Sequence, residues 1–166
     1  MKFQMTSPTR QIFTIGHSTH PIDIFVGMLI AHGIEALVDV RAFPRSRHNP
    51  QFNQDALAEA LRQAGIDYLH MVSLGGLRKH GDGPGETGFS AYLRFTKTDE
   101  FQVSLNRLKE ITLGKSTAIM CAEALWWNCH RQFIAQAMAK DSFAVVHILD
   151  EKHARERNRS PSLPGL

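Results

Sequence analysis

Residues 36–40 have the sequence Ala-Leu-Val-Asp-Val, an apolar run that only Asp39 interrupts. Apolar residues at consecutive positions, instead of alternate ones, are typical of a strand that is covered on both faces. Sheets of this kind occur mostly in α/β proteins, where helices connect parallel strands. This short stretch therefore predicts a parallel sheet between two layers of helices.

The segments on either side of this strand have the pattern of helices. Upstream, Pro21 suits the first position of a helix that extends to about His32. Downstream, Asn53 is suited to cap a helix whose apolar residues form one stripe over residues 56–64. A helix is thus predicted before and after the central strand.

The same alternation of strands and helices continues along the chain. Strands joined by helices cross over in a right-handed sense and usually pair in parallel. The further strands are predicted at residues 11–15, 66–70, 117–120 and 143–148, and the further helices begin near Phe89, after Thr98 or Asp99, and after Asn128.

We therefore expect a single α/β domain over residues 1–150, with a mostly parallel sheet of about five strands flanked by helices on both faces. The alternative is a partial or distorted β/α barrel built from the same units. Residues 151–166 form a polar, basic C-terminal tail, whose first part is compatible with a continuing helix.

Composition excludes several classes of protein. The chain has 166 residues, of which 43% are hydrophobic and 21% charged, as in an ordinary globular domain. Its two cysteines are too few for a secreted disulfide scaffold. No apolar run approaches the roughly 18–20 residues of a membrane helix, and residues 1–10 lack the apolar part of a signal peptide. We expect a soluble, cytoplasmic protein without a membrane partner.

Chemically selective side chains follow the predicted strands at the point where each strand ends. The carboxyl ends of parallel strands meet at one edge of the sheet, where open α/β sheets bind ligands. Solvent at a strand end accepts any polar residue, so His, Cys and Arg at these positions favour a site over simple solvation. The residues concerned are His17 and Ser18, Asp39 and Arg41, His70, Cys121 and Glu123, and His147 and Asp150.

Two thiols lie around the helix that is predicted to begin at Asn128. Cys121 follows a strand, and Cys129 lies in the first turn of the helix, where the positive end of the dipole lowers the pKa of a thiol. Arg131 adds a charge that is suited to bind phosphate or carboxylate. Cys121 is therefore a candidate nucleophile or ligand, with a small buried hydrophobe as the alternative. A reversible disulfide is a further option, although the spacing is not C-x-x-C.

Zinc is a rival use of the same region. Cys121, Cys129, His130 and His17 would serve as ligands if the fold brought them together. Their spacing is unlike that of ordinary zinc pairs, so no cofactor is predicted and zinc stays an alternative.

The net charge of +3 at pH 7 mildly favours anionic partners, and its distribution is uneven. Arg41 and Arg45 belong to a basic loop that is suited to hold phosphate oxygens. A solvated loop is the alternative for Arg45, whereas Arg41, nearest the strand end, is better explained by a site.

A second loop of interest covers residues 73–88, which contain six of the twelve glycines. Loops of this length in compact domains are usually functional or mobile. Gly75 and Gly76 are candidate hinge or close-approach positions, and the basic residues 78–80 are placed to reach an anion.

Five short motifs occur in order along the chain. They are Thr14-Ile15-Gly16-His17-Ser18, Val38-Asp39-Val40-Arg41, Leu74-Gly75-Gly76, Met120-Cys121-Ala122-Glu123 and Cys129-His130-Arg131. Together, over about residues 12–149, they resemble the bacterial and archaeal family known as domain of unknown function 488. The ordered set is specific, although each motif alone is not. The resemblance implies an α/β fold and site residues at these motifs, but it implies no substrate.

These observations favour an enzyme, a hydrolase or transferase, that acts on a small anionic substrate containing phosphate, such as a nucleotide or nucleic acid. The alternatives are a noncatalytic nucleic-acid-binding module that uses the basic loop, Trp126, Trp127 and the basic tail, and a zinc-binding protein. The catalytic candidates are Cys121, Glu123, His17, His130 and Asp39, and the substrate-binding candidates are Arg41, Arg45, Arg131, Ser18, Gly75, Gly76 and Cys129.

Overall fold

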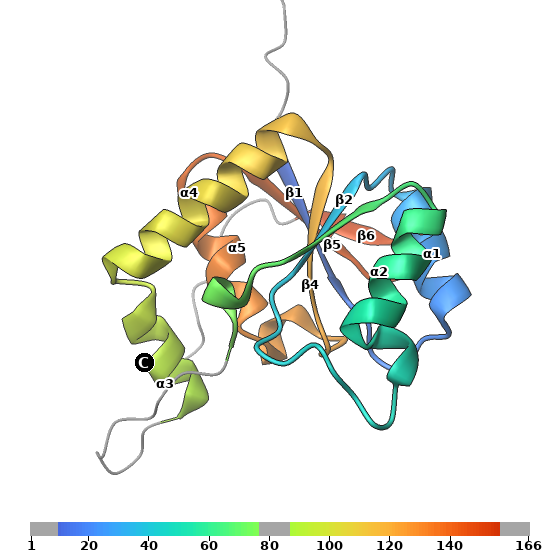
Figure 1. Ribbon diagram of the computed structural model, residues 1–166. Coiled ribbons are helices and arrows are strands. Elements are labelled where there is room, and N and C mark those ends of the chain that lie inside the picture. Colours follow the sequence, from blue (N-terminus) through green and yellow to red (C-terminus); the bar gives the residue numbers. More distant parts are fainter. Residues whose placement is uncertain (1–9, 77–86, 157–166) are drawn as a thin grey trace, which may run out of the picture.

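An open sheet lies at the centre of the protein (Figure 1). The computed structural model describes residues 10–76 and 87–156, and within them the sheet has six strands in the order β3-β2-β4-β1-β5-β6. Strands β1 to β5 pair in parallel, as the sequence predicts, and β6 is antiparallel to β5. The strands are β1 (Gln11–Gly16), β2 (Ala36–Asp39), β3 (Asp67–His70), β4 (Thr117–Cys121), β5 (Ala144–Ile148) and β6 (Ala154–Glu156).

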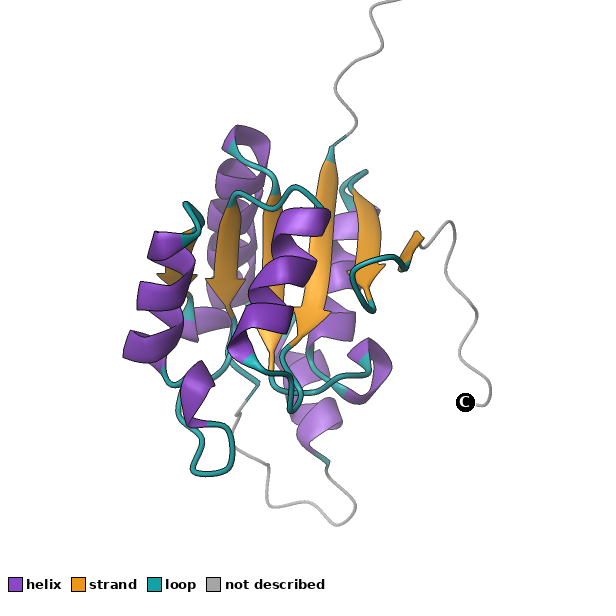
Figure 2. Ribbon diagram, turned by 90° about the vertical axis from the view of Figure 1, so that its right-hand side faces the viewer, coloured by secondary structure: helices purple, strands orange, loops and turns teal. Residues whose placement is uncertain are grey.

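Helices cover both faces of this sheet (Figure 2). The chain moves toward the β3 edge after β1 and toward β5 after β4, and right-handed crossovers in opposite directions place their helices on opposite faces. Helices α1 and α2 therefore lie on one face, and α3, α4 and α5 lie on the other (Figure 1). The helices are α1 (Ile22–Ala31), α2 (Gln54–Gln63), α3 (Gly88–Phe95), α4 (Asp99–Gly114) and α5 (Arg131–Lys140).

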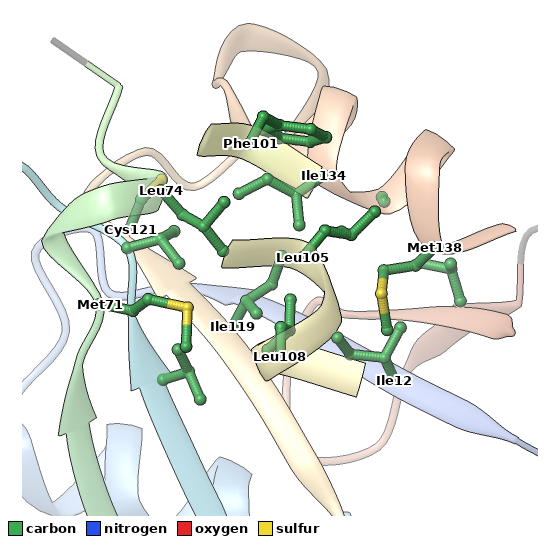
Figure 3. Packing of buried hydrophobic residues seen from close by; sticks show 14 of the residues in the cluster. Ile12, Met71, Leu74, Phe101, Leu105, Leu108, Ile119, Cys121, Ile134 and Met138 are labelled. Carbon is green, nitrogen blue, oxygen red and sulfur yellow. The ribbon is translucent and has the colours of Figure 1, made fainter. Parts of the chain in front are cut away.

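Each face of the sheet has its own apolar core. Phe25, Leu57 and Leu61 pack on the face of α1 and α2. On the other face, Leu105 and Ile134 belong to a larger cluster that also includes Cys121 (Figure 3). Successive side chains of a strand point to opposite faces, which is why a strand buried on both faces has no polar side.

The topology also fixes where the strand loops diverge. Strands β1 and β4 are neighbours, yet the loop after β1 leads to α1 and the loop after β4 leads to α5 on the opposite face. Adjacent loops that leave in opposite directions open a crevice at the carboxyl ends of the strands, where α/β sheets hold their ligands. The sheet stays open, with β3 and β6 as its two edge strands, so the barrel alternative does not apply.

The C-terminal part of the described chain differs from the prediction. A helix after Asp150 is wrong, because Asp150 accepts the backbone N–H groups of Lys152 and His153, both at 2.7 Å, in a turn. The turn reverses the chain, and β6 then pairs with β5. Strand β6 thus lies in the segment predicted as a tail, and the rest of that tail lies outside the described residues.

Two predicted helix caps also differ from the structure. Asn128 does not begin α5, because His130 occupies the capping position and residues 126–128 form a separate 3-10 turn. Asn53 does lie at the start of α2, but its side chain accepts the N–H of Ser46 at 2.8 Å instead of capping the helix. Neither asparagine side chain therefore caps a helix.

Candidate functional site

A pocket of about 490 Å³ lies at the carboxyl ends of β1, β2 and β4, where the crevice is expected. Its lining includes His17 and Ser18 after β1, Arg41 and Arg45 after β2, and Glu123 after β4. Three distant segments of chain thus meet at one place, as the sequence predicts for the strand ends. We call this hollow the rim pocket.

Backbone pairing holds the β1 and β4 sides of the rim pocket together. The N–H of His17 donates to the carbonyl of Cys121, and the N–H of Ser18 donates to that of Ala122, both at 3.0 Å. Gly16 is required at this junction, because a Cβ there would lie 1.9 Å from the carbonyl oxygen of Glu123. Ser18 adopts a φ of 47°, a left-handed conformation that L residues with side chains rarely adopt and that is found often at functional sites.

One side of the rim is formed by what we call the carboxylate cluster, which comprises Asp39, Arg41, Tyr68 and His17. Asp39 is fully buried and binds the Arg41 guanidinium through several hydrogen bonds, the shortest at 2.7 Å from Nη2. The Tyr68 hydroxyl donates a further bond of 2.7 Å to Asp39. The charge of Arg41 is therefore balanced within the protein, and both oxygens of Asp39 accept hydrogen bonds there.

His17 is held as a neutral ring in this cluster. Its Nδ1 donates to the carbonyl of Ser18 at 2.8 Å, so its Nε2 is the acceptor toward Arg41 Nη1 at 3.3 Å. The ring stacks on Phe52 with centroids 4.2 Å apart. Burial, together with the neighbouring Arg41 charge, lowers the pKa of His17 to about 4. At neutral pH this histidine is uncharged and positions Arg41.

Two side chains of the rim pocket keep their charges available. Arg45 and Glu123 are exposed and line the pocket, and no described residue pairs with either charged group. Ser46 and Asn49, which the sequence analysis did not select, lie in the same lining. Polar residues in a basic loop carry no signal of their own, which explains why they were missed.

The other side of the rim is formed by what we call the thiol cluster, which comprises Cys121, Cys129, His130 and Arg131. Cys121 and Cys129 are each 3% exposed, and neither lines the rim pocket. The Cys121 thiol donates to the carbonyl of Glu123 at 4.0 Å. The neighbouring Cys129 and burial raise the pKa of Cys121, which does not favour Cys121 as the predicted nucleophile.

The sulfur of Cys129 has the opposite character. It accepts the backbone N–H of Arg131 at 3.4 Å and lies 3.5 Å from His130 Nδ1. The neighbouring Cys121, the hydrogen bond and charge of His130 and the charge of Arg131 lower the pKa of Cys129, against the effect of burial. These surroundings favour a thiolate at Cys129, which the sequence predicts as a binding group, with zinc or a disulfide as alternatives.

The His130 ring packs closely against the glycine motif, Gly75 and Gly76, beside Cys129. His130 Nε2 donates to the carbonyl of Val40 at 2.8 Å, which fixes the ring. A Cβ on Gly76 would lie 2.5 Å from His130 Nδ1, and one on Gly75 would lie 2.9 Å from the carbonyl of Val72. The two glycines are close-approach positions, as one of the two predictions for them states. The basic residues 78–80 lie outside the described part of the chain.

Arg131 lies beneath the rim pocket and does not line it. The guanidinium is 1% exposed, and its Nη2 donates to the carbonyl of Glu123. Of the anion cradle predicted for Asn128 and Arg131, Asn128 lines the pocket and Arg131 does not. Among residues 10–76 and 87–156, no group of three or more His, Cys, Asp or Glu side chains is arranged to hold a metal ion.

The fold and the pocket define an open α/β domain with a ligand crevice at its strand ends. The chain belongs to the family described as Domain of unknown function DUF488, whose model matches residues 21–138. Four of the five motifs lie within this range, and the motif around His17 precedes it. Searches of curated proteins and of solved structures found no match to the chain. Within the described residues no helix has the length and apolarity to cross a membrane.

Proposed function

We propose that the rim pocket binds a small anionic substrate containing phosphate, and that the protein is a hydrolase or transferase acting on it. The observation that carries this proposal is that one pocket, at the switch point of the sheet, contains two charged groups, Arg45 and Glu123. No described residue forms an ion pair with either of them. The guanidinium of Arg45 can bind the phosphate group of the substrate, and the carboxylate of Glu123 can act as a general acid or base.

Arg45 supplies the attraction for the anion. Arg41 lines the same pocket, but Asp39 already balances its charge. The remaining N–H of Arg41 Nη1 and the polar groups of Ser18, Ser46 and Asn49 offer hydrogen bonds to phosphate oxygens. The pocket therefore combines these hydrogen-bond donors with the charge of Arg45, which no described residue balances.

Glu123 is the acid–base group of this proposal. It is exposed at the pocket and lies directly after β4, on the side opposite the basic loop. His17 is too weak a base for this role, because its lowered pKa reflects burial beside Arg41. We therefore assign His17 and Asp39 as positioning residues and keep proton transfer for Glu123, whereas His130 does not line the pocket.

Two matched variants test the binding part of the proposal. Arg45 and Arg47 are both exposed in the same loop, but only Arg45 lines the pocket. We expect Arg45→Ala to weaken the binding of inorganic phosphate roughly tenfold or more, because a charged hydrogen bond is lost. Arg47→Ala should stay within about twofold of the parent protein, as for an exposed charge. Equal effects of the two variants in a calorimetric titration would contradict the proposal.

The catalytic part is tested by Glu123→Gln. With a panel of phosphate esters and nucleotides as substrates, this variant should retain phosphate affinity and lose turnover by roughly 10²-fold or more. Turnover that survives the substitution would remove Glu123 from the chemistry. Absence of turnover in the parent protein across the panel would leave a binding protein in place of an enzyme.

A noncatalytic nucleic-acid-binding module is the second candidate, and exposed aromatic rings favour it. Phe43, at 71% exposure, lines the pocket beside the basic loop, and Trp127 is 48% exposed after β4. Such rings stack on unpaired bases. By contrast, Trp126 stacks on His147 with centroids 4.2 Å apart, so its face is engaged within the protein. This candidate predicts affinity for single strands that falls steeply with salt and is insensitive to Glu123→Gln.

A further inference from the structure

The positive charge of the buried Arg131 guanidinium has no carboxylate partner among the described residues. Its guanidinium is 1% exposed and donates to the Glu123 carbonyl, while its Nε has no hydrogen-bond partner. No carboxylate forms an ion pair with it among the described residues. A buried cation without a counter-charge is strongly unfavourable, so an anion is expected nearby.

The Cys129 sulfur is the group positioned to supply that anion. It accepts the first backbone N–H of α5, from Arg131, at 3.4 Å. His130 Nδ1 lies 3.5 Å away on the same sulfur, and its Nε2 is committed to the Val40 carbonyl. A proton on Nδ1 would therefore be shared with the sulfur alone. When that proton resides on the ring the sulfur is a thiolate, and the guanidinium of Arg131 and the helix terminus favour this charge.

Cys121 provides a second thiol beside this thiolate. It ends β4, packs in the same apolar cluster as Cys129, and donates to the carbonyl of Glu123 at 4.0 Å. It also belongs to the apolar cluster that includes Leu74 and Met71, where an uncharged thiol is favoured (Figure 3). The two sulfurs thus form an asymmetric pair, with a thiolate at Cys129 and a thiol at Cys121.

We propose that Cys129 is a peroxide-reactive thiolate and that Cys121 is its resolving thiol. The Cys129 sulfur attacks the O–O bond of a hydroperoxide, an S–O bond forms, the O–O bond breaks, and the leaving oxygen takes up a proton as water or an alcohol. The Cys121 sulfur then attacks the sulfenic sulfur, so that a disulfide forms and water leaves. A dithiol reductant restores the two thiols by exchange and is itself oxidised to a disulfide.

The surroundings explain why this chemistry would be confined to small oxidants. Both sulfurs are 3% exposed, so a bulky electrophile has no access to them. The partnerless Nε–H of Arg131 leaves one donor for the negative charge that develops on the leaving oxygen. This activity is independent of the rim pocket, because neither thiol lines it.

The test is a titration of the full-length protein with hydrogen peroxide near pH 7, followed by mass spectrometry. We expect one intramolecular disulfide between Cys121 and Cys129, which dithiothreitol reverses. Cys121→Ser should instead stop at a sulfenic acid on Cys129 that dimedone traps, whereas Cys129→Ser should leave Cys121 unmodified. Failure of the parent protein to form the disulfide, under peroxide that oxidises free glutathione completely, would overturn the proposal.

A positioning variant separates reactivity from mere proximity of two thiols. His130→Gln keeps a donor for the Val40 carbonyl and removes the ring nitrogen beside Cys129. Its Cys129 should oxidise roughly tenfold more slowly at pH 6, with the pH profile displaced toward alkaline values by about one pKa unit. An unchanged profile would remove His130 from the site. Phosphate affinity, measured on the same variants, should not change, so failure here and failure of the proposed function are distinguishable.

Discussion

The two sides of the rim contain one buried arginine each, yet they balance its charge differently. In the carboxylate cluster, Arg41 is 6% exposed and bound to the buried carboxylate of Asp39. In the thiol cluster, Arg131 is 1% exposed, and among the described residues its guanidinium donates to the Glu123 carbonyl alone. A carboxylate is a permanent anion at neutral pH, whereas a thiol becomes one only when its surroundings favour it. We therefore expect the carboxylate cluster to contribute mainly to stability, and the thiol cluster to contain the more reactive group.

The largest effect is expected from removing each arginine in turn. Arg41→Met leaves the Asp39 charge buried without its cation, which should lower the free energy of unfolding by about 3–5 kcal/mol. Arg131→Met leaves only a carbonyl oxygen without its donor and a thiolate that can take up a proton, so we expect a loss of about 1–3 kcal/mol. Urea unfolding at pH 7 measures both. Equal losses in the free energy of unfolding would mean that Arg131 neutralises a buried anion that, like Asp39, stays charged when the arginine is removed.

The second effect is the pH dependence that the carboxylate cluster imposes through His17. The pKa of this ring falls from 6.5 to about 4 on folding, chiefly because of burial. Between these two values the unfolded chain binds a proton that the folded protein does not, so stability falls as the pH is lowered from about 6.5 to 4. The total loss over this range is about 3 kcal/mol.

His17→Gln is the control for that prediction, because glutamine keeps polar atoms and does not titrate. The variant should be less stable at pH 7, and the difference in free energy of unfolding from the parent protein should shrink toward pH 4. A difference that stays constant between pH 7 and pH 4 would show that folding does not shift the pKa of His17.

The third effect concerns Gly16, where the two sides of the rim meet. In Gly16→Ala the new Cβ would lie 1.9 Å from the Glu123 carbonyl oxygen, the same oxygen that accepts from Arg131. The loop after β4 must shift, at a cost of about 1–3 kcal/mol. Gly114→Ala is the matched control: it lies in α4 with nothing within 4 Å of the added Cβ, and we expect a gain of about 0.5–1 kcal/mol.

Thermal unfolding of both glycine variants tests this contrast, and the reactivity of Cys129 adds a second measurement. If the shift of the loop reaches Arg131, then hydrogen peroxide should oxidise Cys129 more slowly in Gly16→Ala and at the rate of the parent protein in Gly114→Ala. Loss of stability without a change in thiol reactivity would mean that the two clusters are mechanically separate.

The fold could be predicted from sequence because its decisive signals are local. The apolar run at residues 36–40 and the helix stripe at residues 56–64 depend on periodicity alone, and both elements form where predicted. Strand β6 carries no such signal, since it is short and lies at the edge of the sheet. The turn at Asp150 that creates it is made by one carboxylate and two backbone N–H groups.

The sequence predicted where the site lies, but not which of its charged groups pair with one another. Residues at strand ends meet because parallel strands align, which brought His17, Arg41 and Glu123 to one pocket. Which groups neutralise one another depends on tertiary distances, so neither the pairing of Arg41 with Asp39 nor the contrast between Cys121 and Cys129 follows from spacing. Asn128 shows the same limit, because a cap preference is real but the loop geometry placed His130 at the start of α5.

The smallest effect is expected from Tyr68→Phe, and it sharpens the contrast between a saturated and an unsaturated cluster. The Tyr68 hydroxyl donates to Asp39 at 2.7 Å, but Arg41 already bonds both oxygens of that carboxylate. Losing one donor of several should cost only about 0.5–1.5 kcal/mol in urea unfolding. Burial and the Asp39 charge also raise the pKa of Tyr68, so the folded parent protein and Tyr68→Phe should show the same phenolate absorbance at about pH 11. A loss comparable to that of Arg41→Met would mean that the hydroxyl, and not the guanidinium, is what keeps Asp39 charged in the core.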